Sequence, residues 1–216
     1  ANGKTLVFEA KPNSGFRTVW DSLLTVSSDD GNKATLIVTK AVNVAVGFKD
    51  IYKVSYSFGE HGQLNVTLDG AEFKSGDYVD SGKVLEFTAN PEEGYKTNWD
   101  PVLAVSSDDK NKATLTVTKL TDVTVAFSPM NEIVYRVKHY KQNIENDEYT
   151  IVTGDTEIKK GDAHSTTEAG PKFYEGFDAK PIEQKTIKPD GSTVVDVYYL
   201  RKSATLTFSV EGGKWE

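Results

Sequence analysis

Residues 83–129 read KVLEFTANPEEGYKTNWDPVLAVSSDDKNKATLTVTKLTDVTVAFSP, and residues 4–50 repeat this pattern without a gap at an offset of 79 residues. The two segments share 26 identities in 47 positions, among them Trp20/Trp99, Gly15/Gly94 and the SSDD run at residues 27–30 and 106–109. Self-similarity at a fixed period is typical of proteins that stack copies of one module. The sequence therefore predicts a tandem array, and it makes an enzyme less expected, because a catalytic site is usually one irregular place on a fold.

Alternating apolar and polar residues predict that the second copy is built of β-strands. Residues 52–58 alternate with a period of two, and the same alternation recurs at residues 64–68, 85–89, 103–105, 113–117 and 123–127. Asp69-Gly70 predicts a tight hairpin, because glycine readily adopts the positive φ that a two-residue turn requires. We predict a complete, small antiparallel β-sandwich over residues 51–129.

The first copy begins part-way through the module. Residues 1–4 correspond to residues 80–83, so residues 1–50 lack the first two or three strands. We predict an N-terminally truncated β repeat with unpaired strand edges and exposed apolar surface, unless it packs on its neighbour. Residues 203–216 alternate at Leu206, Phe208 and Val210 and are interpreted as the start of a further repeat, which favours a monomeric fragment of a longer protein.

Residues 132–202 have a different pattern. Alternation predicts strands at residues 134–140, 149–158, 182–187 and 193–200, and Pro189–Ser192 indicates a turn between the last two. Thr166–Ala169 is expected to form one or two helical turns. We predict a β-grasp-like module, so that the fold class of the chain lies between all-β and α+β.

Composition excludes several classes of site. The chain of 216 residues carries a net charge of −7 without a basic cluster, which disfavours nucleic acid as a partner. It has no cysteine, so disulfides, thiolate metal sites and a cysteine nucleophile are excluded. His61, His139 and His164 lie far apart without metal-ligand spacing, and no apolar run is long enough for membrane insertion. We expect no catalytic residues, no metal site and no cofactor.

Several motifs resemble known repeat families. The second copy contains GEHG (59–62), LDG (68–70), FTANPEEGYKTNW (87–99) and ATLTVTKLTDVTVAF (113–127), and with them it resembles the divergent internalin B-repeat-like modules of bacterial surface proteins. Residues 132–202, with VYRVKHYKQNIENDEYTIV and GFDAKPIEQKTIKPDGSTVVDVYYLRK, resemble mucin-binding-protein-type β-grasp repeats. The tail ATLTFSVEGGKW (204–215) is similar to the start of a Listeria–Bacteroides repeat.

These resemblances imply a non-catalytic repeat region of an extracellular or surface-attached bacterial protein, acting as a stalk or spacer with adhesion to host or matrix as an additional role. The partner is then an unidentified host protein or glycan. The alternative is a carbohydrate- or mucin-binding adhesin in which the third module carries the site. An accessory domain of a secreted hydrolase is the least favoured, because the carboxylates form no recognisable glycosidase or protease motif.

The paired tryptophans are the first candidate residues. Trp20 and Trp99 follow the same Gly-aromatic-basic-Thr pattern. An exposed indole can stack on a sugar, whereas a buried one anchors a small core. Because the residue recurs in both copies and a small sandwich needs such an anchor, we predict a core role, in which Trp99→Ala unfolds the module.

The loop Ser106–Asn111 and its counterpart Ser27–Asn32 each place two adjacent carboxylates beside an asparagine. Calcium prefers six to eight oxygen ligands, and the loops lack the alternating Asp spacing of a calcium loop. Aspartate and asparagine are also the residues that turns favour. We therefore predict hairpin turns at both positions.

The third module is rich in aromatic residues, and it contains one histidine in phase with inward positions. Strand alternation directs about half of such residues inward and leaves the rest as a platform for a glycan or peptide. We expect His139 to be packed among them rather than to bind a ligand, and the sequence identifies no binding residue. The aromatic residues are Tyr135, Tyr140, Tyr149, Phe173, Tyr174, Phe177, Tyr198 and Tyr199.

Overall fold

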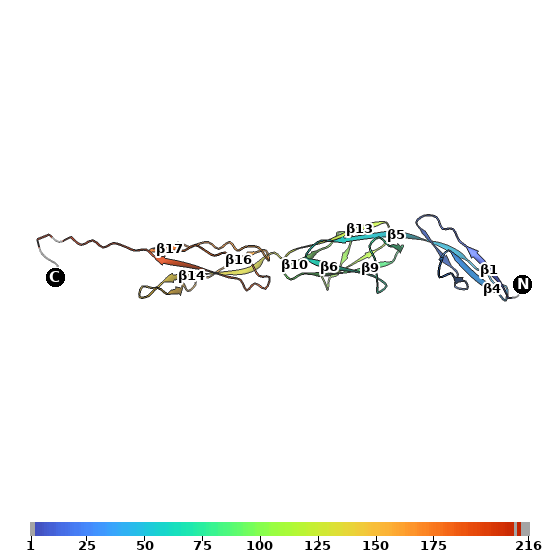
Figure 1. Cartoon of the computed structure of the whole chain (residues 1–216), viewed down its shortest axis with the longest axis horizontal. Coiled ribbons are helices and arrows are strands. Elements are labelled where there is room, and N and C mark those ends of the chain that lie inside the picture. Colours follow the sequence, from blue (N-terminus) through green and yellow to red (C-terminus); the bar gives the residue numbers. More distant parts are fainter. Residues whose placement is uncertain (1–2, 210, 213–216) are drawn as a thin grey trace. The chain divides into compact units, whose positions relative to one another are not determined.

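The computed structural model describes residues 3–209 and 211–212, and among these it contains strands but no helix (Figure 1). The all-β prediction is thereby confirmed for the described residues. The chain divides into two compact units. Unit 1 comprises Ala1–Glu92 and Thr97–Ser128, and unit 2 comprises Glu93–Lys96 and Pro129–Glu216.

The strands of the two repeats follow the predicted alternation. They are β1 (Lys4–Glu9), β2 (Phe16–Trp20), β3 (Thr25–Val26), β4 (Lys33–Val38), β5 (Val46–Phe58), β6 (Gly62–Leu68), β7 (Ala71–Glu72), β8 (Tyr78–Asp80), β9 (Val84–Pro91), β10 (Tyr95–Asn98), β11 (Ala104–Val105), β12 (Lys112–Thr116) and β13 (Thr121–Pro129).

The second copy forms the predicted sandwich. One sheet has the strand order β11-β12-β9-β6-β7, and the other has the order β10-β13-β5-β2, with β8 also paired to β5. Asp69 and Gly70 have φ of 51° and 82°, as expected for the tight turn between β6 and β7. The core between the sheets consists of Val54, Val66, Phe73, Val79, Leu85, Phe87, Leu103, Ala113, Leu115, Val117, Val123 and Val125.

One strand pair departs from the antiparallel prediction. The strand that opens the second copy and the strand that closes it lie side by side and run parallel, with Thr121 opposite Val54 and Val125 opposite Phe58. Their connection includes the whole of the other sheet, and such a long crossover is what a parallel pair requires. The prediction of a purely antiparallel module is therefore wrong at this pair.

The first copy contains the matching strands of half a module. Strands β1, β4 and β3 form a three-stranded sheet that corresponds to β9, β12 and β11, and β2 pairs with β5 as β10 pairs with β13. Few of its apolar side chains are buried: the fully buried ones are Ala10, Leu24 and Ala34. Leu6, Val7, Ile37, Val46 and Phe48 are exposed, as the sequence predicts for a truncated repeat.

Strand β5 connects the two copies without a loop. Its first residues, Val46–Asp50, pair with β2 of the first copy, and its later residues pair with β8 and β13 of the second. The guanidinium of Arg17 in β2 donates two hydrogen bonds to the carboxylate of Asp80 in β8, and Lys49 Nζ lies 3.6 Å from the same carboxylate. One strand and one ion cluster therefore join the copies.

Unit 2 contains a mixed sheet of the order β15-β14-β18-β17, with β16 also paired to β14. The first and last long strands run parallel in its centre, with Val137 opposite Val195 and His139 opposite Val197. The strands are β14 (Ile133–Gln142), β15 (Tyr149–Ile151), β16 (Glu157–Gly161), β17 (Phe177–Ala179) and β18 (Val194–Arg201). The core is formed by Tyr135, Val137, Ala169, Ile187, Val195, Val197 and Tyr199.

The helical turns predicted at Thr166–Ala169 are wrong. Thr166 forms an isolated bridge with Thr186, and the Thr167 backbone N–H donates to the Lys185 carbonyl. Gln184 Oε1 accepts from the Ala169 N–H at 2.9 Å. Backbone groups that a helix would use internally are thus bound to the neighbouring segment, and Gly-Pro at residues 170–171 follows directly.

Two strand predictions in unit 2 also need correction. The predicted strand at residues 149–158 is two strands, β15 and β16, that pair in turn with the same edge of β14. Residues 182–187 form no strand beyond the isolated bridge at Thr186. Residues 203–209 have no regular secondary structure, whereas Val210 and Trp215 lie outside the described residues.

Candidate functional site

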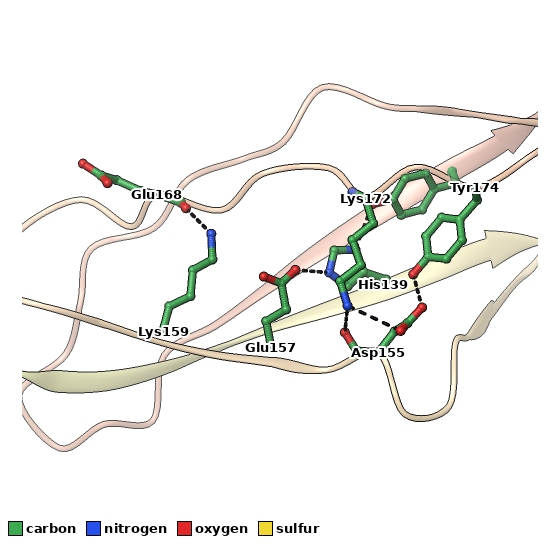
Figure 2. Close-up of polar contacts among 8 residues, drawn as sticks. His139, Asp155, Glu157, Lys159, Glu168, Lys172 and Tyr174 are labelled. Atoms are coloured by element: carbon green, nitrogen blue, oxygen red, sulfur yellow. Dashed lines mark hydrogen bonds and ion pairs between the residues drawn. The ribbon is translucent and has the colours of Figure 1, made fainter.

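The most elaborate polar cluster lies in unit 2, around His139 of β14 (Figure 2). The imidazole is fully buried, as predicted, with Nδ1 2.8 Å from the Tyr199 hydroxyl and Nε2 2.8 Å from Glu157 Oε1. A carboxylate only accepts hydrogen bonds, so Nε2 carries a proton and donates to Glu157. Nδ1 of the neutral ring then accepts from Tyr199, whose oxygen in turn accepts from the Lys172 backbone N–H at 2.7 Å.

A second group of contacts adjoins the imidazole. The Tyr174 hydroxyl donates to Asp155 Oδ2 at 2.5 Å, and Lys172 Nζ donates to the Asp155 carbonyl at 3.0 Å. Tyr174 also packs edge-on against Tyr199, and Lys141 Nζ lies 3.9 Å from the centre of its ring. These residues come from β14, β18 and two loops, so the cluster fastens the irregular segment over the sheet (Figure 2).

The acidities of this cluster follow from its contacts. The hydrogen bond from Tyr174 holds the pKa of Asp155 below its ordinary value, and Lys172 acts in the same direction. Burial raises the pKa of Tyr174, and the bonded Asp155 carboxylate raises it further. Burial is also the main cause of the raised pKa of Tyr199. Both phenols therefore stay protonated at neutral pH and act as hydrogen-bond donors.

The geometry of this cluster favours a structural role. His139 is enclosed by its partners, so a substrate would have to displace the core to reach it. Each of its nitrogens is already bonded, and a satisfied buried network makes a fold more specific. The sequence pointed to His139, Tyr174 and Tyr199, but it gave no sign of Asp155, Glu157 or Lys172, because these are polar residues in or beside turns that the sheet brings together.

The outer face of the same sheet carries exposed aromatic rings. Tyr140 and Tyr198 stack at 5.2 Å between ring centres, and Tyr149 meets Tyr198 edge-on at 5.0 Å. Burial raises the pKa of Tyr140, as does the neighbouring Asp196 carboxylate. Asp196 Oδ1 is buried and has no hydrogen-bond partner among the described residues. We call Tyr140, Tyr149 and Tyr198 the tyrosine platform.

The other aromatic residues of the third module divide as alternation predicts. Tyr135 and Tyr199 point into the core, and Tyr174 and Phe177 pack against it. Phe173 is exposed on the loop that precedes β17. The structure therefore separates an inner set that stabilises the module from an outer set that is available to a partner.

The two tryptophans occupy equivalent environments. Each indole is partly buried, and Trp99 packs against the core of the second copy, in agreement with the predicted anchor role. Trp99 Nε1 donates to the Lys110 carbonyl at 2.7 Å, and Trp20 Nε1 donates to the Gly31 carbonyl at 2.7 Å. Each indole therefore also holds the acidic hairpin loop of its own copy.

The acidic loops are hairpin turns, as predicted. In the second copy, Ser106 Oγ accepts from the backbone N–H groups of Asp108 and Asp109. Asp109 Oδ1 accepts from the Asn111 N–H at 2.9 Å, and Asn111 Oδ1 accepts from Thr97 at 3.0 Å. The first copy repeats this set of bonds. The loop side chains are therefore used to close the turn.

Two searches of the described part of the chain found nothing. No group of three or more His, Asp or Glu side chains there is arranged to hold a metal ion. No helix of residues 3–209 or 211–212 is long and apolar enough to cross a membrane.

Comparisons with known proteins bear on the second copy. Residues 52–131 match the family described as the divergent InlB B-repeat domain, which confirms the resemblance for this segment. No curated protein sequence matches the chain. Among solved structures, the C-terminal fragment of the pilus adhesin SpaC from Lactobacillus rhamnosus GG aligns with 73% of this chain and 99% of that chain, at 12% identity and a TM-score of 0.31. The resemblances of residues 132–202 and 203–216 remain predictions.

Proposed function

We propose that this chain is a non-catalytic repeat region of a bacterial surface or secreted protein, and that it acts as a spacer whose neighbouring repeats are held in a fixed relation. The observation that carries the proposal is strand β5, which runs through the junction of the two copies and pairs with both. A flexible linker allows neighbouring modules to swing, whereas a strand with ladder bonds on both sides of the junction resists bending.

The charged contacts at the junction support the same role. Arg17 belongs to the first copy and Asp80 to the second, and their two parallel hydrogen bonds form a bidentate pair of defined geometry. Lys49, on the shared strand, adds a second cation to the same carboxylate. The extracellular setting is supported by the family that residues 52–131 match, and protease accessibility on intact cells of the source organism would test it.

The spacer proposal is testable by measuring the spread of distances between the two copies. Because the chain has no cysteine, Ile37→Cys and Thr116→Cys provide unique spin-label sites at equivalent exposed strand positions. We expect a narrow distance distribution by double electron–electron resonance. Two glycines inserted between Asp50 and Ile51 should broaden it, whereas the same insertion between Lys40 and Ala41, in an exposed loop, should not. A broad distribution in the unmodified chain would contradict the proposal.

A second candidate function is glycan binding by the third module, and the tyrosine platform favours it. Stacked aromatic rings on an open sheet face offer the flat apolar surface that a sugar ring packs against. A glycan array should then show reproducible binding that Tyr198→Ala abolishes. The matched control is Tyr78→Ala, which removes an exposed tyrosine from β8 in the other unit. Binding that survives Tyr198→Ala would assign the activity elsewhere.

A further inference from the structure

We infer that the exposed apolar face of the first copy is an acceptor for the β5–β8 unit of another chain that carries the same repeat. By this unit we mean a segment equivalent to residues 51–82, and by the acceptor face we mean the inward side of β1 and β4 with the free edges of β1 and residues 42–46. This goes beyond a spacer role, because it gives the chain a specific partner and a defined docking register.

The first argument is the difference in burial between identical residues. Leu6 is 48% exposed, whereas its counterpart Leu85 is 0% exposed, and Val46 at 48% compares with Val125 at 0%. The side chains are the same, and only the strands above them differ. The second copy therefore shows directly what kind of structure covers this surface.

The second argument is that the acceptor is already in the conformation of the occupied copy. The Gly3 N–H donates to the Val38 carbonyl at 2.7 Å, and the equivalent bond from Gly82 to Val117 is also 2.7 Å. The Ala10 N–H donates to the Asn32 carbonyl at 2.8 Å, against 2.9 Å from Ala89 to Asn111. A preformed acceptor needs little ordering when a partner binds, which lowers the cost of binding.

The third argument is that both ladders of the acceptor are open. In the second copy, β6 pairs with β9 so that Val66 faces Phe87 and Leu68 faces Leu85. Strand β1 pairs only with β4 among the described residues, so the edge that corresponds to the β6 side of β9 is free. Residues 42–45, which correspond to strand residues 121–124, form no strand in the absence of a parallel neighbour.

These pairings fix the register of the docked unit. Residues equivalent to Val66 and Leu68 should face Phe8 and Leu6, and residues equivalent to Val54–Phe58 should pair in parallel with residues 42–46. This is recognition by strand addition, in which main-chain bonds supply affinity and alternate side chains supply specificity.

Two side-chain features commit the acceptor to this occupant. Lys83 Nζ pairs with Asp69 Oδ2 of the covering unit at 2.6 Å, and Lys4 is the equivalent lysine of the first copy. Gly62 lies against the ring of Phe127, where an added Cβ would be 2.5 Å from Cζ. Phe48 is the equivalent aromatic residue, so the docked unit needs a glycine at this position. A generic apolar strand supplies neither feature.

The test uses the full chain and a synthetic peptide of residues 51–82 with a fluorescent label. We expect saturable binding by fluorescence anisotropy, and new amide-exchange protection confined to β1 and residues 42–46. Peptide Gly62→Val and chain Leu6→Asp should each weaken binding more than tenfold. The matched control is chain Val7→Glu, which introduces on the outward face the residue type that Glu86 places there in the second copy, and it should bind normally.

The outcomes divide clearly. No saturable binding, or binding that is unaffected by both Gly62→Val and Leu6→Asp, overturns the inference. Concentration-dependent dimerisation of the chain alone that Leu6→Asp abolishes would assign the face to a second first copy instead. Should the free peptide precipitate, the same segment fused ahead of Ala1 replaces it. It must then protect β1 amides and raise the melting temperature, and the absence of both effects overturns the inference.

Discussion

The two copies of the repeat share more than half of their residues, yet they use them differently. In the second copy Leu85 and Val125 lie at the centre of a sandwich, whereas in the first copy the identical Leu6 and Val46 face solvent. The residues themselves form the same strands in both places. What differs is the covering unit of β5–β8, which only the second copy packs against its inward face. Burial is therefore a property of the neighbours that a strand acquires and not of the strand alone.

Local contacts show the opposite behaviour. Each indole donates to the loop carbonyl at the same distance of 2.7 Å, and each acidic turn has the same pattern of bonds. These contacts join residues close in sequence, so they form in each copy regardless of what covers it. The comparison thus separates interactions that the repeat makes by itself from interactions that need the rest of the module.

The largest effect should distinguish the cores of the two copies. Leu85→Ala removes a fully buried side chain and should lower the free energy of unfolding of the second copy by about 4 kcal/mol. Leu6→Ala removes the equivalent exposed side chain and should cost less than about 1 kcal/mol. Urea unfolding followed by near-ultraviolet circular dichroism measures both. Equal losses would show that the first copy is covered in solution.

The tryptophans should give the next largest effect. Trp99→Ala removes an anchor of the second core and the bond to the Lys110 carbonyl, so we expect a loss of about 3 kcal/mol and unfolding of the module near physiological temperature. Trp20→Ala should cost clearly less, because the first copy has a smaller core around it. A Trp99→Ala variant that retained its melting temperature would contradict the anchor role.

The repeat, the strands and the turns could be read from the sequence because each depends on a few neighbouring residues. Asp69-Gly70 encodes its own turn, and alternation along residues 52–58 encodes its own strand. The parallel pairing of β5 with β13 could not be read, because parallel and antiparallel neighbours require the same alternation. The continuity of β5 across the junction was also missed, since a strand that changes partners has no distinct pattern.

The third module shows the same limit. The alternation of β14 placed His139 inside with Tyr135, which the structure confirms. Its partner Glu157 and the nearby Asp155 lie at the ends of a predicted strand that is in fact two, so the sequence offered no reason to bring them together. The helical turns predicted at residues 166–169 failed because Gln184 and Lys185, distant in sequence, supply competing hydrogen bonds.

A smaller and equal effect is expected for the two acidic turns. Asp109→Ala and Asp30→Ala each remove one carboxylate that accepts a backbone N–H two residues later. The net value of such a bond is about 1 kcal/mol, and both losses should agree within experimental error because the turns are local. Separate unfolding of the two copies, followed by amide exchange, provides the measurement. A marked difference between them would mean that covering strands also stabilise the turn.

The smallest effect concerns the pH dependence of the junction between the copies. The hydrogen bonds from Arg17 hold the pKa of Asp80 below the ordinary value of 3.8, with further help from Lys49. A lowered folded-state pKa means that the ionised carboxylate stabilises the native junction at neutral pH. This contribution is complete above the ordinary pKa and is lost as the pH falls through the lowered one.

Acidification should therefore broaden the distance distribution between spin labels at positions 37 and 116 before either copy unfolds. Asp80→Asn removes the titrating group and should give a distribution that hardly changes over the same acid range. Asp69→Asn is the matched control, because its partner Lys83 belongs to the same copy and does not bridge the junction. If the unmodified chain and Asp80→Asn responded alike to acid, the shared strand alone would hold the two copies together, and the ion cluster would be incidental to the spacer.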